Sequence, residues 1–195
     1  MTTRLDAEDR AAGRLVRRAF AKLTGRGGEP LHYALMDDTP VGVIGLAAGP
    51  AGLRRIDYVE DEDQFVARML RLFPDCPLDR SAALDPVRRE LEGYFKGRHF
   101  VFQARVDLSA VTPFQQRVLH ELLKVPAGKV TTYTRLAARV GRPKAARAVG
   151  NAMHTNPVPI IVPCHRVLRG DGSLGGYGGG LPAKEWLLRL EGAII

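Results

Sequence analysis

The sequence predicts an α/β (α+β) protein with a small antiparallel sheet and helices in its first half and a mainly helical second half. Residues 31–59 alternate short apolar runs with turn residues such as Asp37-Asp38, which is typical of antiparallel strands. From residue 112 onward, short helical segments begin and end at recognisable cap residues. The positive charge of the chain is also concentrated in this second half.

An N-terminal extension, residues 1–29, precedes the sheet. Within it, residues 7–24 have the pattern of an amphipathic helix that ends at Gly25. The N-terminus lacks the apolar core of a signal peptide, and no apolar run approaches the roughly 20 residues needed to cross a bilayer. Two cysteines, Cys76 and Cys164, are too few for a disulfide scaffold. We therefore expect a cytoplasmic protein with no membrane contact.

Two helices and a strand are predicted after the sheet. The first helix places Phe65, Met69 and Leu72 on one face. The second helix begins with Asp85 as its cap. Residues 99–108 then alternate between two sets of side chains, as a strand does.

The second half begins with a helix whose first turn, Thr112 to Gln115, has the sequence of a capping box. Residues 131–141 and 144–154 form two further short helices around a glycine-containing turn, which is the helix-turn-helix arrangement. The change of pattern places a domain boundary near residue 108, with one domain over residues 30–107 and the other over residues 108–195.

The charge distribution favours a polyanionic partner. Residues 1–104 carry 16 Lys+Arg and 16 Asp+Glu, whereas residues 105–195 carry 13 and 5. Between Arg117 and Arg147 there are eight basic residues and a single acid, Glu121. A solvated helical surface is the simpler explanation of a basic run, but an excess confined to one half fits phosphate binding better.

Cys164 is the candidate nucleophile. It follows an apolar run, Val158–Val162, that is predicted as a buried strand, and it precedes His165 and Arg166, the kind of neighbours that turn a thiol into a thiolate. His165 can accept the thiol proton directly or through a water. Glu191 lies in the last turn of the final helix, where a carboxylate opposes the helix dipole. It is either a solvated side chain or the group that orients His165.

A glycine-rich segment separates these residues. Residues 169–182 contain seven glycines in fourteen positions and lack the Lys-Ser/Thr of a phosphate-binding loop. The segment is either a mobile surface loop or a lid whose backbone approaches a flat ligand closely, with Tyr177 as its one large polar side chain.

Three stretches of the second half resemble the O6-alkylguanine-DNA alkyltransferase family. They are "NPVPIIVPCHRV", "KAARAVGNAM" and "GGLPAKEWLLRLEG", and the similarity runs without gaps from Pro113 to Gly192. Residues 30–104 resemble the family only in their length and in their pattern of strands and helices. The resemblance implies a ribonuclease H-like N-terminal domain, a winged helix-turn-helix C-terminal domain, and repair of O6-alkylguanine, and of O4-alkylthymine, in duplex DNA.

The resemblance also implies roles for individual residues. Cys164 takes the alkyl group irreversibly, once per molecule, and His165, polarised by Glu191, handles the protons. Tyr133 promotes flipping of the damaged base, and Arg147 fills the vacancy in the stack. Asn156 ties the DNA-binding helix to the segment that carries the cysteine. The remaining implied contacts are Ala145, Ala146 and Ala148 with the minor groove, and Tyr177, Gly178, Val167, Pro159 and Met153 around the alkylguanine.

The resemblance implies alkylated double-stranded DNA as the partner, no cofactor, no obligate protein partner, and a monomer that binds DNA singly or cooperatively. One departure is Gly178, where many relatives have serine, so a side-chain contact to the base is lost. Some relatives carry zinc in the first domain, but Cys76 and scattered histidines are too few here for a tetrahedral site, which predicts no metal.

Two alternatives remain at the level of sequence. One is a winged-helix regulator or lesion sensor whose Cys164 never reacts. The other is a cysteine hydrolase that uses Cys164, His165 and Glu191, although that function leaves the basic helix-turn-helix unexplained.

Overall fold

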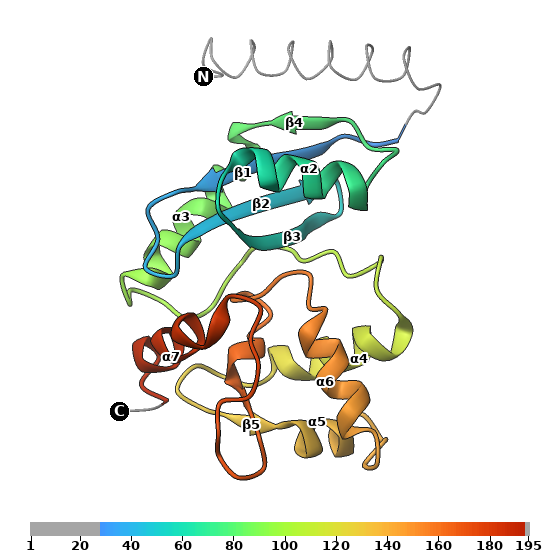
Figure 1. The fold of residues 1–195 in the computed structure, drawn as a ribbon, viewed down its shortest axis with the longest axis vertical. Coiled ribbons are helices and arrows are strands. Elements are labelled where there is room, and N and C mark those ends of the chain that lie inside the picture. Colours follow the sequence, from blue (N-terminus) through green and yellow to red (C-terminus); the bar gives the residue numbers. More distant parts are fainter. Residues whose placement is uncertain (1–27, 194–195) are drawn as a thin grey trace.

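The computed structural model describes residues 28–193, so the predicted helix over residues 7–24 lies outside the described part (Figure 1). The first half is built on a four-stranded sheet with the order β3-β2-β1-β4. Its strands are β1 (Leu31–Met36), β2 (Val43–Gly49), β3 (Gly52–Val59) and β4 (Leu78–Arg80).

The sheet is mixed, which corrects the prediction of a purely antiparallel one. β1, β2 and β3 are antiparallel neighbours as expected, but β4 pairs parallel to β1. The reason is the crossover that connects β3 to β4, because it contains helix α2 (Glu62–Leu72) and returns the chain to the opposite edge of the sheet.

The two faces of the sheet are covered differently. Phe65 and Met69 of α2 pack with Leu35 and Ala47 on one face. On the other face lie helix α3 (Asp85–Phe95) and the second half of the chain. The prediction that Leu72 lies on the buried face of α2 is wrong, because Leu72 is 45% exposed.

Two local predictions in this half are also wrong. Asp85 is the first residue of α3 rather than its cap, because a 3-10 turn, η1 (Ala82–Leu84), leads directly into the helix. Residues 99–108 form no regular strand and make a single bridge, between Val106 and Leu53 of β3. Part of the reason is Glu90, whose Oε2 accepts the backbone N–H groups of residues 103 and 104 at 2.8 and 3.2 Å and so occupies donors that a strand partner would need.

The second half contains four helices and a two-stranded parallel sheet within the described residues. The helices are α4 (Pro113–Leu123), α5 (Tyr133–Arg139), α6 (Ala146–His154) and α7 (Gly180–Leu190), and the strands are β5 (Thr131–Thr132) and β6 (Val167–Leu168). Only half of the predicted capping box forms. Thr112 Oγ1 accepts the Gln115 N–H at 3.3 Å, but the Gln115 side chain donates to Thr155 O at 3.1 Å and so links α4 to the end of α6.

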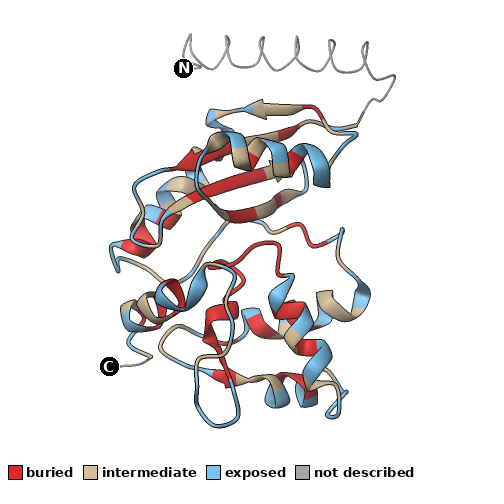
Figure 2. Cartoon of the chain, viewed as in Figure 1, coloured by how far each residue is buried: buried red, intermediate tan, exposed pale blue. Residues whose placement is uncertain are grey.

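One hydrophobic cluster runs through both halves (Figure 2). It joins residues of the sheet, such as Ile44 and Leu46, to residues of the helical part, such as Leu119 and Val162. The domain boundary near residue 108 stays a prediction. None of the helices described here has the length and apolar character of a bilayer-spanning segment.

Candidate active site

The segment that leads to Cys164 is a buried turn and not the predicted strand. Val162 N–H donates to Val158 O at 2.9 Å, which closes the turn. Ile160 within it has φ 72°, a left-handed conformation that β-branched residues rarely adopt. Prolines at residues 157, 159 and 163 explain the difference, because they remove backbone donors that a ladder requires.

Asn156 holds this turn closed from within. Its Nδ2 donates to Val162 O at 2.8 Å, and its Oδ1 accepts the Val158 N–H at 3.1 Å. The side chain is buried, so an unpaired amide here would be costly. Because Asn156 follows α6 closely, the turn that presents the cysteine is tied to that helix.

The Cys164 thiol is neutral rather than the expected thiolate. The residue begins a 3-10 turn, η2 (Cys164–Arg166), and is 8% exposed. Burial raises the pKa of the Cys164 thiol to about 11, and the Asn156 side chain and the Lys184 ammonium offset only part of this effect. The adjacent cation, Arg166, pairs with Glu191 instead. The thiol therefore needs a base at neutral pH.

Glu191 is buried and accepts hydrogen bonds from three side chains. His165 Nε2 lies 3.0 Å from its Oε1, and because a carboxylate only accepts, Nε2 carries the proton. Arg166 donates from Nε to Oε2 and from Nη2 to Oε1, both at 2.8 Å, and Tyr94 Oη donates to Oε1 at 2.7 Å. Burial opposes ionisation of Glu191, but the bonds from His165 and Arg166 outweigh it and lower the pKa to about 2.

His165 is poised as a neutral base. Its ring is fully buried, and this burial lowers its pKa despite the carboxylate beside it. Nε2 is committed to Glu191, whereas Nδ1 is buried and makes no hydrogen bond to any described group. With the proton fixed on Nε2, the Nδ1 lone pair is the atom that can receive a proton.

A cavity of about 160 Å³ contains the thiol. Several of the residues predicted from sequence lie together around it, whereas Pro159 and Val167 are buried nearby and do not line it. Its lining is Tyr133, Gly150, Met153, His154, Cys164, Gly176, Tyr177 and Gly178.

The predicted DNA-contacting residues lie on the outside of the same region. Arg147 and Ala148 on α6 are exposed, and Ala145 and Ala146 at its start are half-buried. The eight basic residues from Arg117 to Arg147 are all exposed. Among residues 28–193 no three His, Cys, Asp or Glu side chains come together as metal ligands would.

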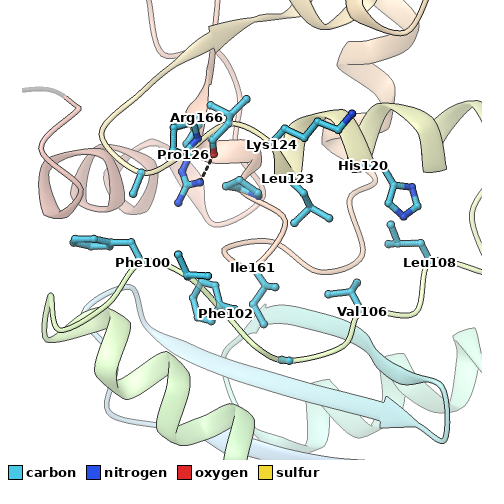
Figure 3. A pocket seen from close by; sticks show the side chains of 15 residues that line it. Phe100, Phe102, Val106, Leu108, His120, Leu123, Lys124, Pro126, Ile161 and Arg166 are labelled. Carbon is cyan, nitrogen blue, oxygen red and sulfur yellow. Dashed lines mark hydrogen bonds between the residues drawn. The ribbon is translucent and has the colours of Figure 1, made fainter.

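A larger cavity of about 650 Å³ lies between residues 100–108, the end of α4 and the segment from Ile161 to Arg166 (Figure 3). Phe100 and Phe102 form one wall, and Leu123 at the end of α4 faces them. Arg166 lines it and donates from Nη1 to Val125 O at 2.5 Å. Cys164 does not line this cavity, although Pro163 and Arg166 do.

The sequence reasoning missed two buried polar side chains of the site, Tyr94 and Lys184. Lys184 is fully buried, where it donates from Nζ to Val167 O at 2.6 Å and to Leu174 O, and burial lowers its pKa to about 8. A signal for it existed, because Lys184 precedes Leu187 and Leu188 by one helical turn and so falls on the apolar face of α7.

Comparisons with known proteins show which family the chain belongs to. Residues 113–193 match the family described as "6-O-methylguanine DNA methyltransferase, DNA binding domain". The methylated-DNA–protein-cysteine methyltransferase of Methanosarcina acetivorans is 37% identical over 163 residues, which cover 84% of this chain and 99% of that protein. The chain belongs to the methylated-DNA–protein-cysteine methyltransferase family. It is therefore a DNA repair methyltransferase that transfers an alkyl group from DNA to a cysteine of its own.

Solved structures of the family share the fold. The crystal structure of Mycobacterium tuberculosis OGT in complex with DNA has a TM-score of 0.71 and 38% identity, covering 83% of this chain and 93% of that one. The methyltransferase of Pyrococcus kodakaraensis has a TM-score of 0.61 and 29% identity, covering 83% and 99%. The α/β class is thus confirmed, and membership of this methyltransferase family sets aside the hydrolase and the non-reacting sensor.

The buried charges predict a specific response of stability to Glu191→Gln. The change leaves the Arg166 guanidinium buried without its anion, which should lower the free energy of unfolding by roughly 3–5 kcal/mol at neutral pH. The control is Glu185→Gln, an exposed position on the same helix, which should change it by less than about 0.5 kcal/mol. Urea unfolding measures both.

The pH dependence gives a second check on the same variant. A carboxyl whose pKa is lowered by folding stabilises the protein above its unfolded pKa, and this contribution is lost as the pH falls through the folded pKa. The advantage of the wild type over Glu191→Gln should therefore shrink between about pH 4.5 and about pH 2. An advantage that stays constant across this range, or none at neutral pH, would contradict the ion-pair assignment.

Proposed function

We propose that the protein removes alkyl groups from O6 of guanine, and from O4 of thymine, in duplex DNA by a single irreversible transfer to Cys164 after base flipping. The observation that carries this proposal is a buried Cys164 followed directly by a buried His165 whose Nε2 lies 3.0 Å from Glu191. Burial raises the pKa of the thiol and lowers that of the imidazole, which favours the neutral form of both. Exposed basic residues on the surrounding helices supply the affinity for the DNA backbone.

The chemistry follows from the protonation states. The thiol proton passes to His165 Nδ1, directly or through a water, and Sγ attacks the alkyl carbon. The carbon–oxygen bond breaks, its electron pair stays on the base, and the protonated His165 returns the proton to the base as it leaves. The product is a thioether with no acyl or phosphoryl group for water to attack, so the protein is used once.

The alkylguanine is held by groups around the smaller cavity. Tyr177 offers its hydroxyl to the ring, Gly178 offers its backbone N–H to O6, and Met153 forms part of the wall. The carbonyls of Cys164 and Val167 accept from the exocyclic amine. Val167 O already accepts from Lys184 Nζ, but a carbonyl has a second lone pair for the base. Pro159 supports the turn beneath them.

Base flipping brings the lesion to this site, because the alkylated oxygen is out of reach within the stack. The cavity of about 160 Å³ is small compared with ligand sites of roughly 300–1,000 Å³, so the glycine-rich segment moves aside as the base enters. Tyr133 crowds the target phosphate and Arg147 fills the vacancy. Ala145, Ala146 and Ala148 let α6 approach the minor groove.

The finer architecture belongs to the same proposal. α5 and α6 act as the helix-turn-helix of a winged helix, and the mixed sheet corresponds to a ribonuclease H-like domain. The protein works as a monomer without metal or obligate protein partner, and it binds neighbouring sites on DNA singly or cooperatively. Its two cysteines are free thiols, which suits the cytoplasm, with access to the nucleoid, or the nucleus in a eukaryote.

Cys164→Ala tests the transfer step. The variant should form no product with a duplex containing O6-methylguanine, yet bind that duplex nearly as well as the wild type, because phosphate contacts come from the basic helices. Intact-mass analysis of the wild type should show one added methyl group per molecule, located by peptide mapping on Cys164. A methyl group on Cys76, or several turnovers per molecule, would refute the proposal.

His165→Ala tests the proposed base. The variant should retain slow transfer, with a rate reduced on the order of 10²–10⁴-fold, because acid-base assistance is lost.

Arg147→Ala tests the flipping role. It should slow repair of duplex DNA more than transfer from free O6-methylguanine, because the free base needs no partner in the stack. The matched control is Arg142→Ala, an exposed cation in the turn before α6, which should weaken duplex binding without changing transfer from the free base. Equal losses on both substrates for Arg147→Ala would count against its proposed role of filling the vacancy in the stack.

A further inference from the structure

Two tyrosines from the first half of the chain reach into the active site of the second half. Tyr58 lies on β3, and Tyr94 lies on α3. Each hydroxyl is hydrogen-bonded at 2.7 Å to a side chain of the site, Tyr58 to Tyr177 and Tyr94 to Glu191. Burial raises the pKa of both tyrosines far above 10, so both keep their protons at physiological pH.

β3 is fixed to the segment that presents the cysteine. Ile56 N–H donates to Pro157 O at 2.8 Å, directly after Asn156. Leu53 exchanges two backbone hydrogen bonds with Arg105 and Asp107, at 2.8 and 2.9 Å. The Ile56 bond therefore holds the strand that carries Tyr58 on the active-site turn, and the two Leu53 bonds tie the same strand to the segment that connects the two halves.

Tyr58 also sets the position of the glycine-rich segment. Its ring meets that of Tyr177 edge-on with centroids 5.8 Å apart. A Cβ added at Gly179 would lie 2.7 Å from the Tyr58 ring, closer than side chains tolerate, so the ring rests directly on the backbone of the segment. Gly179 has φ −87°, which every residue can adopt, so this contact and not backbone geometry requires glycine there.

The hydroxyl pair has a chemical consequence. Each phenol has one proton to donate, so Tyr177 can donate to a bound base only if Tyr58 donates to Tyr177. This order makes a chain of hydrogen bonds from Tyr58 through Tyr177 to the ligand, in which each bond strengthens the next. Tyr58 is thus in a position to aim the Tyr177 proton at the cavity.

Tyr94 acts on the other end of the site. Glu191 Oε1 accepts from Tyr94, from His165 and from Arg166. Tyr94 is fully buried among aromatic rings, including those of Phe95 and Phe102, which fix its orientation. It therefore limits how Glu191 can turn and how much negative charge the carboxylate presents to His165.

From these contacts we propose that the first half of the chain completes the active site through two positioning residues, Tyr58 for Tyr177 and Tyr94 for Glu191. The inference rests on the proposed roles of Tyr177 and Glu191 in transfer. In this proposal the first half of the chain contributes directly to the transfer reaction by positioning two residues of the active site.

A double-mutant cycle tests the Tyr58 contact. In the full-length protein, Tyr58→Phe should slow transfer from methylated duplex roughly three- to tenfold, the value of about one hydrogen bond. Tyr58→Phe combined with Tyr177→Phe should be no slower than Tyr177→Phe alone. The control is Tyr33→Phe, which removes a hydroxyl bonded to Glu62 at 2.8 Å on the far face of the sheet and should leave the rate unchanged. Thermal unfolding of each variant shows that the fold is retained.

A second variant reaches the same contact from the other side. Gly179→Ala keeps both hydroxyls but pushes the segment off the Tyr58 ring, and it should slow transfer at least as much as Tyr58→Phe. Gly170→Ala, where an added Cβ meets no atom within 4 Å, should have no effect. Gly179→Ala with the wild-type rate would overturn the role of Tyr58 in placing the segment.

The pH profile of transfer tests Tyr94. In Tyr94→Phe the carboxylate loses one donor and holds a proton on His165 more strongly, while Arg166 and Lys184, the cations that face His165, are unchanged. The acid limb of the rate profile should move to higher pH in Tyr94→Phe and stay in place in Tyr33→Phe. A profile that keeps its midpoint would overturn the role of Tyr94.

The outcomes separate this inference from the proposed function. If Tyr177→Phe and Glu191→Gln transfer as fast as the wild type, the proposed roles of those residues fail, and positioning fails with them. If those variants are slow while Tyr58→Phe and Tyr94→Phe are fast, only the positioning role is refuted. Additive losses for the Tyr58 and Tyr177 variants would refute it as well, because they would show independent actions.

Discussion

The active site depends on one buried negative charge, the carboxylate of Glu191. It sits at the end of α7, where the helix dipole opposes an anion, and burial adds a further cost. Arg166, His165 and Tyr94 offset both costs. His165 and Arg166 are neighbours in η2, whereas Tyr94 and Glu191 are far from them in sequence. The fold must therefore bring α3, η2 and α7 together before the cost of burying the Glu191 charge is offset. The site is thus assembled only when the core has folded correctly.

The same charge decides how the cysteine is activated. Burial lowers the pKa of His165, and the Arg166 charge beside Glu191 lowers it further, so the imidazole stays neutral. Arg166 is engaged with Glu191 and is not free to lower the pKa of Cys164. In the proposed mechanism the thiol therefore stays unreactive until His165 removes its proton. If the protein reacts only once, as proposed, a neutral resting thiol protects Cys164 from loss to other electrophiles, since the thiolate is the nucleophile.

The sequence was sufficient to propose candidate catalytic residues and insufficient to predict the side chains that hold them in place. Cys164, His165 and Glu191 were candidates because their sequence context is unusual, a cysteine among prolines and cations and a carboxylate at a helix C-terminus. The structure places His165 Nε2 3.0 Å from Glu191, as the hypothesis requires. Tyr58 and Tyr94 look like ordinary apolar-face residues, and only long-range contacts reveal their hydroxyl partners. The strands expected at Val158–Val162 and residues 99–108 did not form, because backbone donors for a ladder were lacking there. Prolines remove donors in the first segment, and the Glu90 carboxylate occupies donors in the second. A periodic pattern of apolar residues reveals neither effect.

The central claim is that Cys164 rests as a thiol and depends on His165 for activation. Thiolate absorbance, measured against pH in a Cys76→Ser variant, tests it most directly because Cys164 is then the only cysteine in the chain. The account predicts almost no thiolate at neutral pH and a titration that begins only well on the alkaline side, toward the pKa of about 11. A Cys164 that is already mostly thiolate at neutral pH would contradict it.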